Sequence, residues 1–86
     1  MGRNTHIPRL GVTNHIHLLR SGRGGMTQQE LADRVGVSRQ TVNAIEGGKY
    51  LPSLEVAFRI AMVFERRVDE VFLCAVIDDS SSIPKR

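Results

Sequence analysis

Residues 27–46 read TQQELADRVGVSRQTVNAIE and carry the start and stop signals of two short helices. Thr27, followed three residues later by Glu30, forms a capping box, in which each side chain satisfies a backbone amide at the start of a helix. Gly36 ends this helix because a residue without a Cβ takes the left-handed conformation easily. Ser38 then caps a second helix that runs to the end of the segment. The sequence therefore predicts two helices joined by a tight glycine turn.

The apolar residues of this segment have the spacing of a helix-turn-helix motif. In a window that begins at Gln28, the fifth residue is Ala32, which is small because the two helices cross closely there. The ninth is Gly36, at the left-handed turn. The larger apolar positions are Leu31, Val35, Val37, Val42 and Ile45. These side chains fix the angle between the helices and bury the pair against the rest of the domain.

The remaining sequence predicts three more short helices and no strong strand. Thr13 is expected to cap a first helix over residues 14–20, and the glycines of residues 21–25 form a loop. A fourth helix begins after Ser53, and its predicted apolar stripe comprises Leu54, Ala57, Phe58, Ala61 and Phe64. A fifth helix is expected over residues 68–73. The predicted organisation is a flexible arm at 1–12, an all-α domain at 13–77 and a disordered tail at 78–86.

The outward face of the second helix of the motif carries polar side chains suited to reading base edges: Arg39, Gln40, Thr41 and Asn43. Arginine can bind guanine through two hydrogen bonds, glutamine or asparagine can bind adenine, and a threonine methyl can pack on thymine. Gln28 lies in the first turn of the preceding helix. Its backbone amide and its side chain can bind a phosphate at the positive end of that helix.

Composition and charge limit the kind of protein. The 86 residues form one small domain with 41% hydrophobic residues, 24% charged residues and a net charge of +3. Residues 1–50 hold seven basic and three acidic residues, a balance of +4, so this half is the better candidate to face a polyanion. The single cysteine, Cys74, indicates a reducing compartment, and no apolar run is long enough to span a membrane. We expect a cytoplasmic protein.

These motifs resemble the Cro/repressor-like (Xre) helix-turn-helix family over residues 14–72. The matching segments are MTQQELA (26–32), GVSRQTV (36–42), IEGGKY (45–50), PSL (52–54) and DEVF (69–72). The resemblance implies a compact five-helix, lambda-repressor-like domain that binds DNA through its second and third helices, usually as a dimer on an inverted repeat. It also implies that the residues that contact backbone phosphate are Gln28, Ser38, Lys49 and Tyr50, and that Glu46 pairs with an arginine of the first helix, Arg20.

Three features depart from the family pattern. The loop between the first two helices is longer and richer in glycine than usual, which affects the register of Arg20 against Glu46. The fourth helix lacks the usual terminal glycine, so we expect a modified turn at residues 65–67. The arm before Thr13 is longer than the domain needs.

Residues 71–77, VFLCAVI, form an apolar run that a small core cannot bury completely. An exposed apolar patch usually marks an interface. We expect a two-fold dimer contact through Leu73, Val76 and Ile77, either as an extended helix or as a strand that pairs with its mate. The alternative is that the run folds back onto the first helix.

The sequence favours a sequence-specific, DNA-binding transcriptional regulator that is a homodimer. One alternative is the antitoxin of a toxin–antitoxin pair, in which the tail after Asp78 wraps a protein partner; another is an interaction module that does not bind DNA. The chain has no paired carboxylates in a pocket and no plausible triad, so we expect no enzyme. His15 and His17 point to different sides of a helix, so we expect no zinc site and no cofactor.

Overall fold

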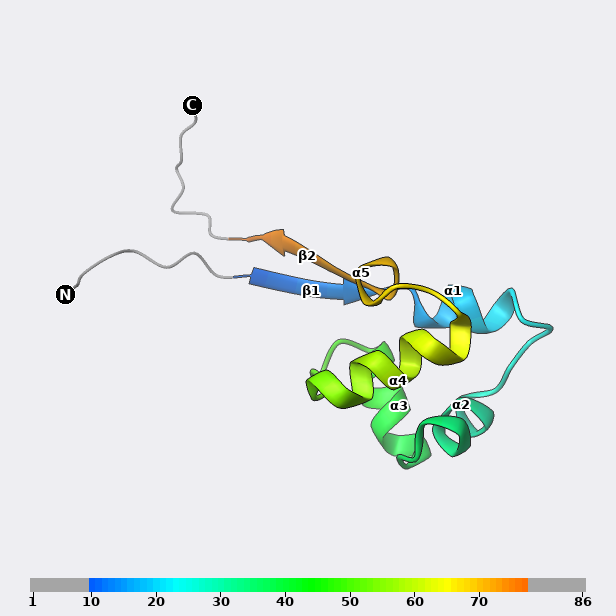
Figure 1. Cartoon of the computed structure of the whole chain (residues 1–86). Coiled ribbons are helices and arrows are strands. Elements are labelled where there is room, and N and C mark those ends of the chain that lie inside the picture. Colours follow the sequence, from blue (N-terminus) through cyan, green and yellow to red (C-terminus); the bar gives the residue numbers. More distant parts are fainter. Residues whose placement is uncertain (1–9, 78–86) are drawn as a thin grey trace, which may run out of the picture.

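The computed structural model describes residues 10–77, in which five short helices are enclosed in sequence by two strands (Figure 1). The elements are β1 (Leu10–Asn14), α1 (Ile16–Ser21), α2 (Gln28–Val35), α3 (Arg39–Glu46), α4 (Leu54–Phe64), α5 (Val68–Val71) and β2 (Phe72–Val76). Helices α2 and α3 pack against each other, and α4 packs on α2 and α5. None of the described helices is both long and apolar enough to cross a membrane.

The predicted caps of α2 and α3 are confirmed. The Thr27 hydroxyl accepts a hydrogen bond from the Glu30 amide at 3.0 Å, and the Glu30 carboxylate accepts one from the Thr27 amide at 2.8 Å. Gly36 ends α2 with a φ of 89°, in the left-handed region. Ser38 accepts a hydrogen bond from the Thr41 amide at the start of α3. Local side-chain chemistry therefore sets the ends of both helices.

The core lies between α1, α2, α3, α4 and α5. Five of the apolar residues predicted to fix the α2–α3 pair are buried, namely Leu31, Ala32, Val35, Val42 and Ile45. Val37, at the turn, is only half-buried. On α4, the predicted stripe is wrong at two positions, because Leu54 and Phe58 are exposed and Ile60 is buried instead. Each helical residue turns about 100°, so a face centred on Ile60 and Phe64 leaves Phe58 to one side.

The prediction of an all-α domain is wrong, because β1 and β2 form a two-stranded antiparallel ribbon. Its register pairs Leu10 with Val76 and Asn14 with Phe72. The helix predicted to start after Thr13 begins instead at Ile16, and α5 ends at Val71 rather than Leu73. The backbone amides and carbonyls of β2 pair with those of β1, at the other end of the described chain. Because these residues are far apart in the sequence, no local pattern predicts the pairing.

The ribbon projects from the helices, and both ends of the described chain lie at its tip (Figure 1). The flexible arm was expected to extend to residue 12, but Leu10–Val12 belong to β1. The expected arm residues 1–9 and the expected tail 78–86 lie outside the described residues.

The turn between α4 and α5 has the modified form that the sequence predicts. Glu65 follows the last residue of α4 with a φ of 56°, in the left-handed region that usually favours glycine. The Arg67 amide then donates to the Glu70 carboxylate at 2.7 Å, which stabilises the start of α5. The start of α5 thus keeps the carboxylate half of a capping box, although a long basic residue, Arg67, stands at the cap position.

Candidate nucleic-acid interface

The N-terminal part of α3 presents an open polar face. Arg39, Gln40 and Asn43 are exposed, and Thr41 is half-buried. On the opposite side of the same helix, Val42 and Ile45 are buried in the core and hold α3 in place. The structure thus brings the four residues predicted to face bases onto one helix whose orientation is fixed by packing.

Ser38 and Thr41 are linked at the start of α3. The two hydroxyl oxygens lie 2.9 Å apart, and the Ser38 oxygen also accepts a hydrogen bond from the Thr41 amide at 3.1 Å. These contacts use the Ser38 side chain as a helix cap, while the residue stays exposed at the surface. Its position beside Arg39 places it at the edge of the polar face.

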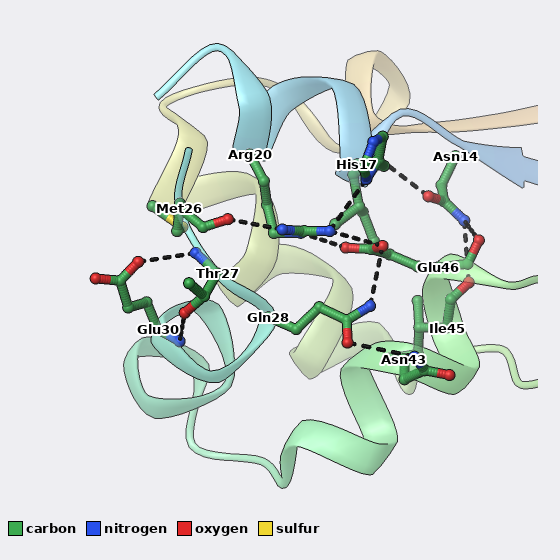
Figure 2. Close-up of polar contacts among 11 residues, drawn as sticks. Asn14, His17, Arg20, Met26, Thr27, Gln28, Glu30, Asn43, Ile45 and Glu46 are labelled. Atoms are coloured by element: carbon green, nitrogen blue, oxygen red, sulfur yellow. Dashed lines mark hydrogen bonds and ion pairs between the residues drawn. The ribbon is translucent and has the colours of Figure 1, made fainter. Parts of the chain in front are cut away.

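Gln28 connects the start of α2 to α3 (Figure 2). Its side-chain nitrogen donates to the Glu46 carboxylate at 3.2 Å, and its side-chain oxygen accepts from the side-chain nitrogen of Asn43 at 3.3 Å. A residue predicted to bind phosphate and one predicted to read a base are therefore in direct contact. The two hydrogen bonds fix the start of α2 relative to the polar face of α3.

The expected pair of Arg20 and Glu46 forms, despite the glycine-rich loop between α1 and α2. The Arg20 guanidinium donates to both carboxylate oxygens of Glu46, and the side chains are only 12% and 10% exposed. Arg20 also donates to the Met26 carbonyl at 2.7 Å, so the same side chain closes the loop (Figure 2). The hydrogen bond with Glu46 raises the pKa of Arg20, which stays charged.

This pairing also affects the electrostatics of the candidate interface. Glu46 is the acidic residue at the end of α3, and its carboxylate is shared between Arg20 and Gln28. A carboxylate that is neutralised in this way repels an approaching phosphate less than an unpaired one. Arg39, at the start of the helix, remains an exposed positive charge.

Asn14 is a structural residue that the sequence does not reveal. Its side-chain nitrogen donates to the Ile45 carbonyl at 3.0 Å and also contacts the Glu46 carbonyl, both at the C-terminal end of α3. Its side-chain oxygen accepts from the Ile16 amide and so satisfies the start of α1. Because Asn14 ends β1, it joins the base of the ribbon to α3.

Lys49 and Tyr50 lie exposed on the loop that follows α3. Gly48, with a φ of 76°, turns the chain there, and the Lys49 amide donates to the Ala44 carbonyl at 2.9 Å. Both residues predicted to contact phosphate are thus held next to the end of α3. Residues 47–50 of this loop are all exposed.

The three residues expected at a dimer contact do not share one face of the ribbon. Side chains alternate along a strand, which places Leu73 and Ile77 on the face that carries Gly11 and Val76 on the opposite face. The contact between Ile77 and Gly11 agrees with this, because a Cβ at Gly11 would lie 3.0 Å from the Ile77 side chain. Within the described chain β2 pairs with β1 along one edge, and the expected contact with a mate stays a prediction.

Histidines 15 and 17 lie at the start of α1. The His17 Nδ1 atom lies 3.1 Å from an Arg20 guanidinium nitrogen, which adds a third group to the Arg20–Glu46 cluster. Within residues 10–77, no three His, Cys, Asp or Glu side chains are grouped as a metal site would need.

The sequence of this chain is similar to that of known helix-turn-helix proteins. The family model described as "Helix-turn-helix" matches residues 17–71. An uncharacterised HTH-type transcriptional regulator from Archaeoglobus fulgidus is 53% identical over 49 residues, which cover 57% of this chain and 70% of that protein. The uncharacterised HTH-type transcriptional regulator YgzD from Bacillus subtilis is 46% identical over 61 residues, which cover 71% of this chain and 91% of that protein.

A solved structure shows the same fold at low sequence identity. The crystal structure of a candidate DNA-binding protein from Bacteroides fragilis superposes with a TM-score of 0.63 and 21% identity. The match covers 71% of this chain and 97% of that chain. At this identity the likeness concerns the fold alone.

Proposed function

This chain belongs to the Cro/C1-type helix-turn-helix family of transcriptional regulators, and from that premise we propose that it binds a specific DNA sequence as a homodimer on an inverted-repeat operator. The observation that carries the proposal is the exposed polar face of α3, whose orientation is fixed from behind by Val42 and Ile45. A regulator of this kind acts in the cytoplasm, where the DNA lies.

In this proposal α3 enters the major groove and reads base edges. Its N-terminal residues reach furthest into the groove, so Arg39 and Gln40 make the principal base contacts. Asn43, one turn further along, contacts the next base. Thr41 packs its methyl group on a thymine or contacts the adjoining phosphate.

The same docking places residues on both sides of α3 against the phosphate backbone. Gln28 offers its backbone amide at the N-terminus of α2, and its contacts with Glu46 and Asn43 hold that amide in register with α3. Ser38, Lys49 and Tyr50 contact phosphates on the two sides of the groove. These contacts position the protein, whereas the α3 contacts supply specificity.

Two copies related by a two-fold axis would place their α3 helices in successive major grooves, about 34 Å apart. The antitoxin alternative depends on a partner for the tail after Asp78, which lies outside the described residues. The interaction-module alternative is disfavoured by the face itself, because its exposed side chains, Arg39, Gln40 and Asn43, are neither acidic nor bulky and apolar.

The test compares binding to an operator selected from random DNA with binding to unrelated DNA. For Gln40→Ala we expect a loss of about 1–3 kcal/mol on the operator and almost no loss on unrelated DNA. For Lys49→Ala we expect a similar loss on both DNAs and a smaller salt dependence.

Gln29→Ala is the matched control. Gln29 is an exposed glutamine of α2 whose side chain donates to Asp33 within the same helix, and it is not among the residues proposed to contact DNA. This variant should bind both DNAs as the parent does. Equal losses for Gln40→Ala on operator and unrelated DNA would contradict base reading by α3.

A further inference from the structure

Helix α4 exposes a stripe of large apolar side chains that the core does not use. Leu54, Phe58 and Met62 follow one another at four-residue intervals, and they are 71%, 52% and 74% exposed. Residues at this spacing lie on one side of a helix, so the stripe is continuous. It runs alongside the buried face of α4 that carries Ile60 and Phe64.

One face of the β-ribbon continues this apolar surface. Val12 and Phe72, which lie on that face, line a groove of about 340 Å³ together with Leu51, Leu54 and Val68. The same ribbon face carries the remaining side chains of alternate positions, which are Leu10, Cys74, Val76 and, at the base of the ribbon, the polar Asn14. The ribbon face, the loop before α4 and the α4 stripe thus form one surface, which we call the α4–ribbon face.

We infer that the α4–ribbon face is where a second copy of this chain binds. The inference rests on the proposed homodimer and assigns its contact surface. It replaces the expected contact through Leu73, Val76 and Ile77, because only Val76 of these three lies on this side of the ribbon.

The size of the face fits a partner of this kind. Each large apolar side chain carries on the order of 100 Å² of apolar surface. Six such side chains are about half exposed or more, namely Leu10, Leu51, Leu54, Phe58, Met62 and Val76. They supply several hundred Å² on each copy, and the half-buried Val12 and Phe72 add to this. A standard stable interface removes roughly 800 Å² per partner.

The ribbon itself needs a covering surface. An isolated two-stranded ribbon is only marginally stable in water, and this one has five residues in each strand. A partner seated on its apolar face would remove those side chains from water and stabilise the pairing of β1 with β2.

The charges at the ends of the α4 stripe are complementary under a two-fold axis. Glu55, which also pairs with Arg59 of its own helix, lies at the N-terminal end, and Arg66 lines the groove beside Phe58 and Met62 at the C-terminal end. Arg66 makes no ion pair with another of residues 10–77. If the two α4 helices pack antiparallel, Glu55 of each copy meets Arg66 of the other. A self-complementary surface of this kind is what a two-fold dimer requires.

The location of the face agrees with the proposed DNA contacts. Leu51 directly follows Lys49 and Tyr50, so the face begins where the predicted phosphate contacts end. None of the α3 residues proposed to read bases lies in it. Asn14 joins the ribbon to the end of α3, so the dimer contact also bears on the position of α3.

The test is sedimentation velocity of the full chain without DNA, over a range of concentrations. The parent should be a dimer, and Leu54→Glu and Met62→Glu should each raise the dimer dissociation constant at least about 30-fold, as removal of an interface anchor does. Both side chains are exposed in the single chain, so neither change should unfold it, which a circular dichroism melt would verify.

Leu18→Glu is the matched control, because Leu18 is 67% exposed and belongs to α1, not to the ribbon or to the apolar stripe of α4. This variant should leave the dimer intact. A monomeric parent would overturn the inference, and so would a parent dimer that Leu54→Glu and Met62→Glu leave unchanged. Either result would mean that a second copy does not bind the α4–ribbon face.

A charge exchange tests the antiparallel arrangement. Glu55→Arg and Arg66→Glu should each weaken the dimer, and the double variant should recover most of the loss. Failure of the double variant to recover would rule out this pairing. These measurements contain no DNA, so they test the dimer contact independently of DNA binding. A failure of the proposed function would appear instead as a parent dimer that selects no DNA sequence.

Discussion

The surface around α3 and the α4–ribbon face differ in chemistry and in how they are held. Around α3, exposed polar side chains are backed by a network in which Arg20, Gln28 and Glu46 satisfy one another. The α4–ribbon face is apolar, and its strands come from the two ends of the described chain. The first surface suits a hydrated polyanion, and the second suits another protein surface. A domain this small can separate the two tasks because they occupy different elements.

The largest expected effect comes from breaking the network behind α3. Glu46→Ala removes the partner of a nearly buried arginine, so we expect the free energy of unfolding to fall by about 2–4 kcal/mol. Urea unfolding at neutral pH measures this loss. In the parent, pairing with Glu46 raises the pKa of Arg20 above its ordinary value. The stabilisation that Arg20 gains from its charge is therefore fully present at neutral pH and is lost only when the pH rises through this raised pKa.

Glu55→Ala is the control for this substitution. Glu55 pairs with Arg59 within α4, but both side chains are exposed, and such a surface pair contributes about 0.5 kcal/mol or less. Measured on the monomeric Leu54→Glu background, the two substitutions should therefore differ by more than 1 kcal/mol. Equal effects would show that the Arg20–Glu46 pair does not stabilise the α3 side as described.

The turn between α2 and α3 should be the next most sensitive position. Gly36 has a φ of 89°, and a Cβ there would lie 3.3 Å from an Arg59 guanidinium nitrogen, which itself donates to the Val35 carbonyl. We expect Gly36→Ala to cost about 1–2 kcal/mol in thermal or urea unfolding. Gly22, with a φ of −72°, is the comparison. A Cβ there would make only ordinary contacts, at 3.6 and 3.7 Å from the Leu18 and Leu19 carbonyl oxygens, so Gly22→Ala should be neutral or slightly stabilising.

Two asparagines separate structural from DNA-binding roles on the α3 side. Asn14→Ala removes the hydrogen bonds that join the ribbon to the end of α3, so we expect a loss of about 1 kcal/mol in unfolding free energy. Asn43→Ala removes one exposed hydrogen bond, to Gln28, so it should lower the unfolding free energy by only about 0.5 kcal/mol and weaken operator binding. If Asn14→Ala were as stable as the parent, the ribbon would not be coupled to α3 through this residue.

The smallest effect is expected at the end of α4. Glu65 holds a left-handed conformation that glycine adopts without strain, so Glu65→Gly should raise the free energy of unfolding by about 0.5–1 kcal/mol. The ion pair with Arg23 that this change removes is long, at 3.8 Å, and Glu65 is exposed, so its loss should matter little. A destabilised variant would mean that this contact outweighs the backbone strain.

The α2–α3 region could be predicted almost completely from the sequence. Its helix ends depend on side chains within three residues of the amides they cap, such as Thr27 with Glu30. Its buried positions follow helical spacing, as at Val42 and Ile45. The Arg20–Glu46 pair came from the family resemblance, because nothing local links residues on different helices.

The ribbon could not be predicted in the same way. The pairing of Leu10 with Val76 joins residues from opposite ends of the described chain, and the residues before Asn14 carry no strand signal of their own. The error at Leu54 and Phe58 has a related cause. Apolar spacing on α4 fits two overlapping faces, and only the packing of α2 and α5 decides which one is buried.

The most direct test of base reading by α3 and of the dimer contact is selection of bound sequences from a random duplex pool. The selection is carried out in parallel with the parent chain and with Leu54→Glu. We predict that the parent enriches an inverted repeat whose half-sites lie about one helical turn apart, and that Leu54→Glu enriches at most a single half-site. A parent that enriches no sequence and binds only through salt-sensitive backbone contacts would contradict base reading by α3. The same inverted repeat enriched equally by Leu54→Glu would contradict the α4–ribbon face as the dimer contact.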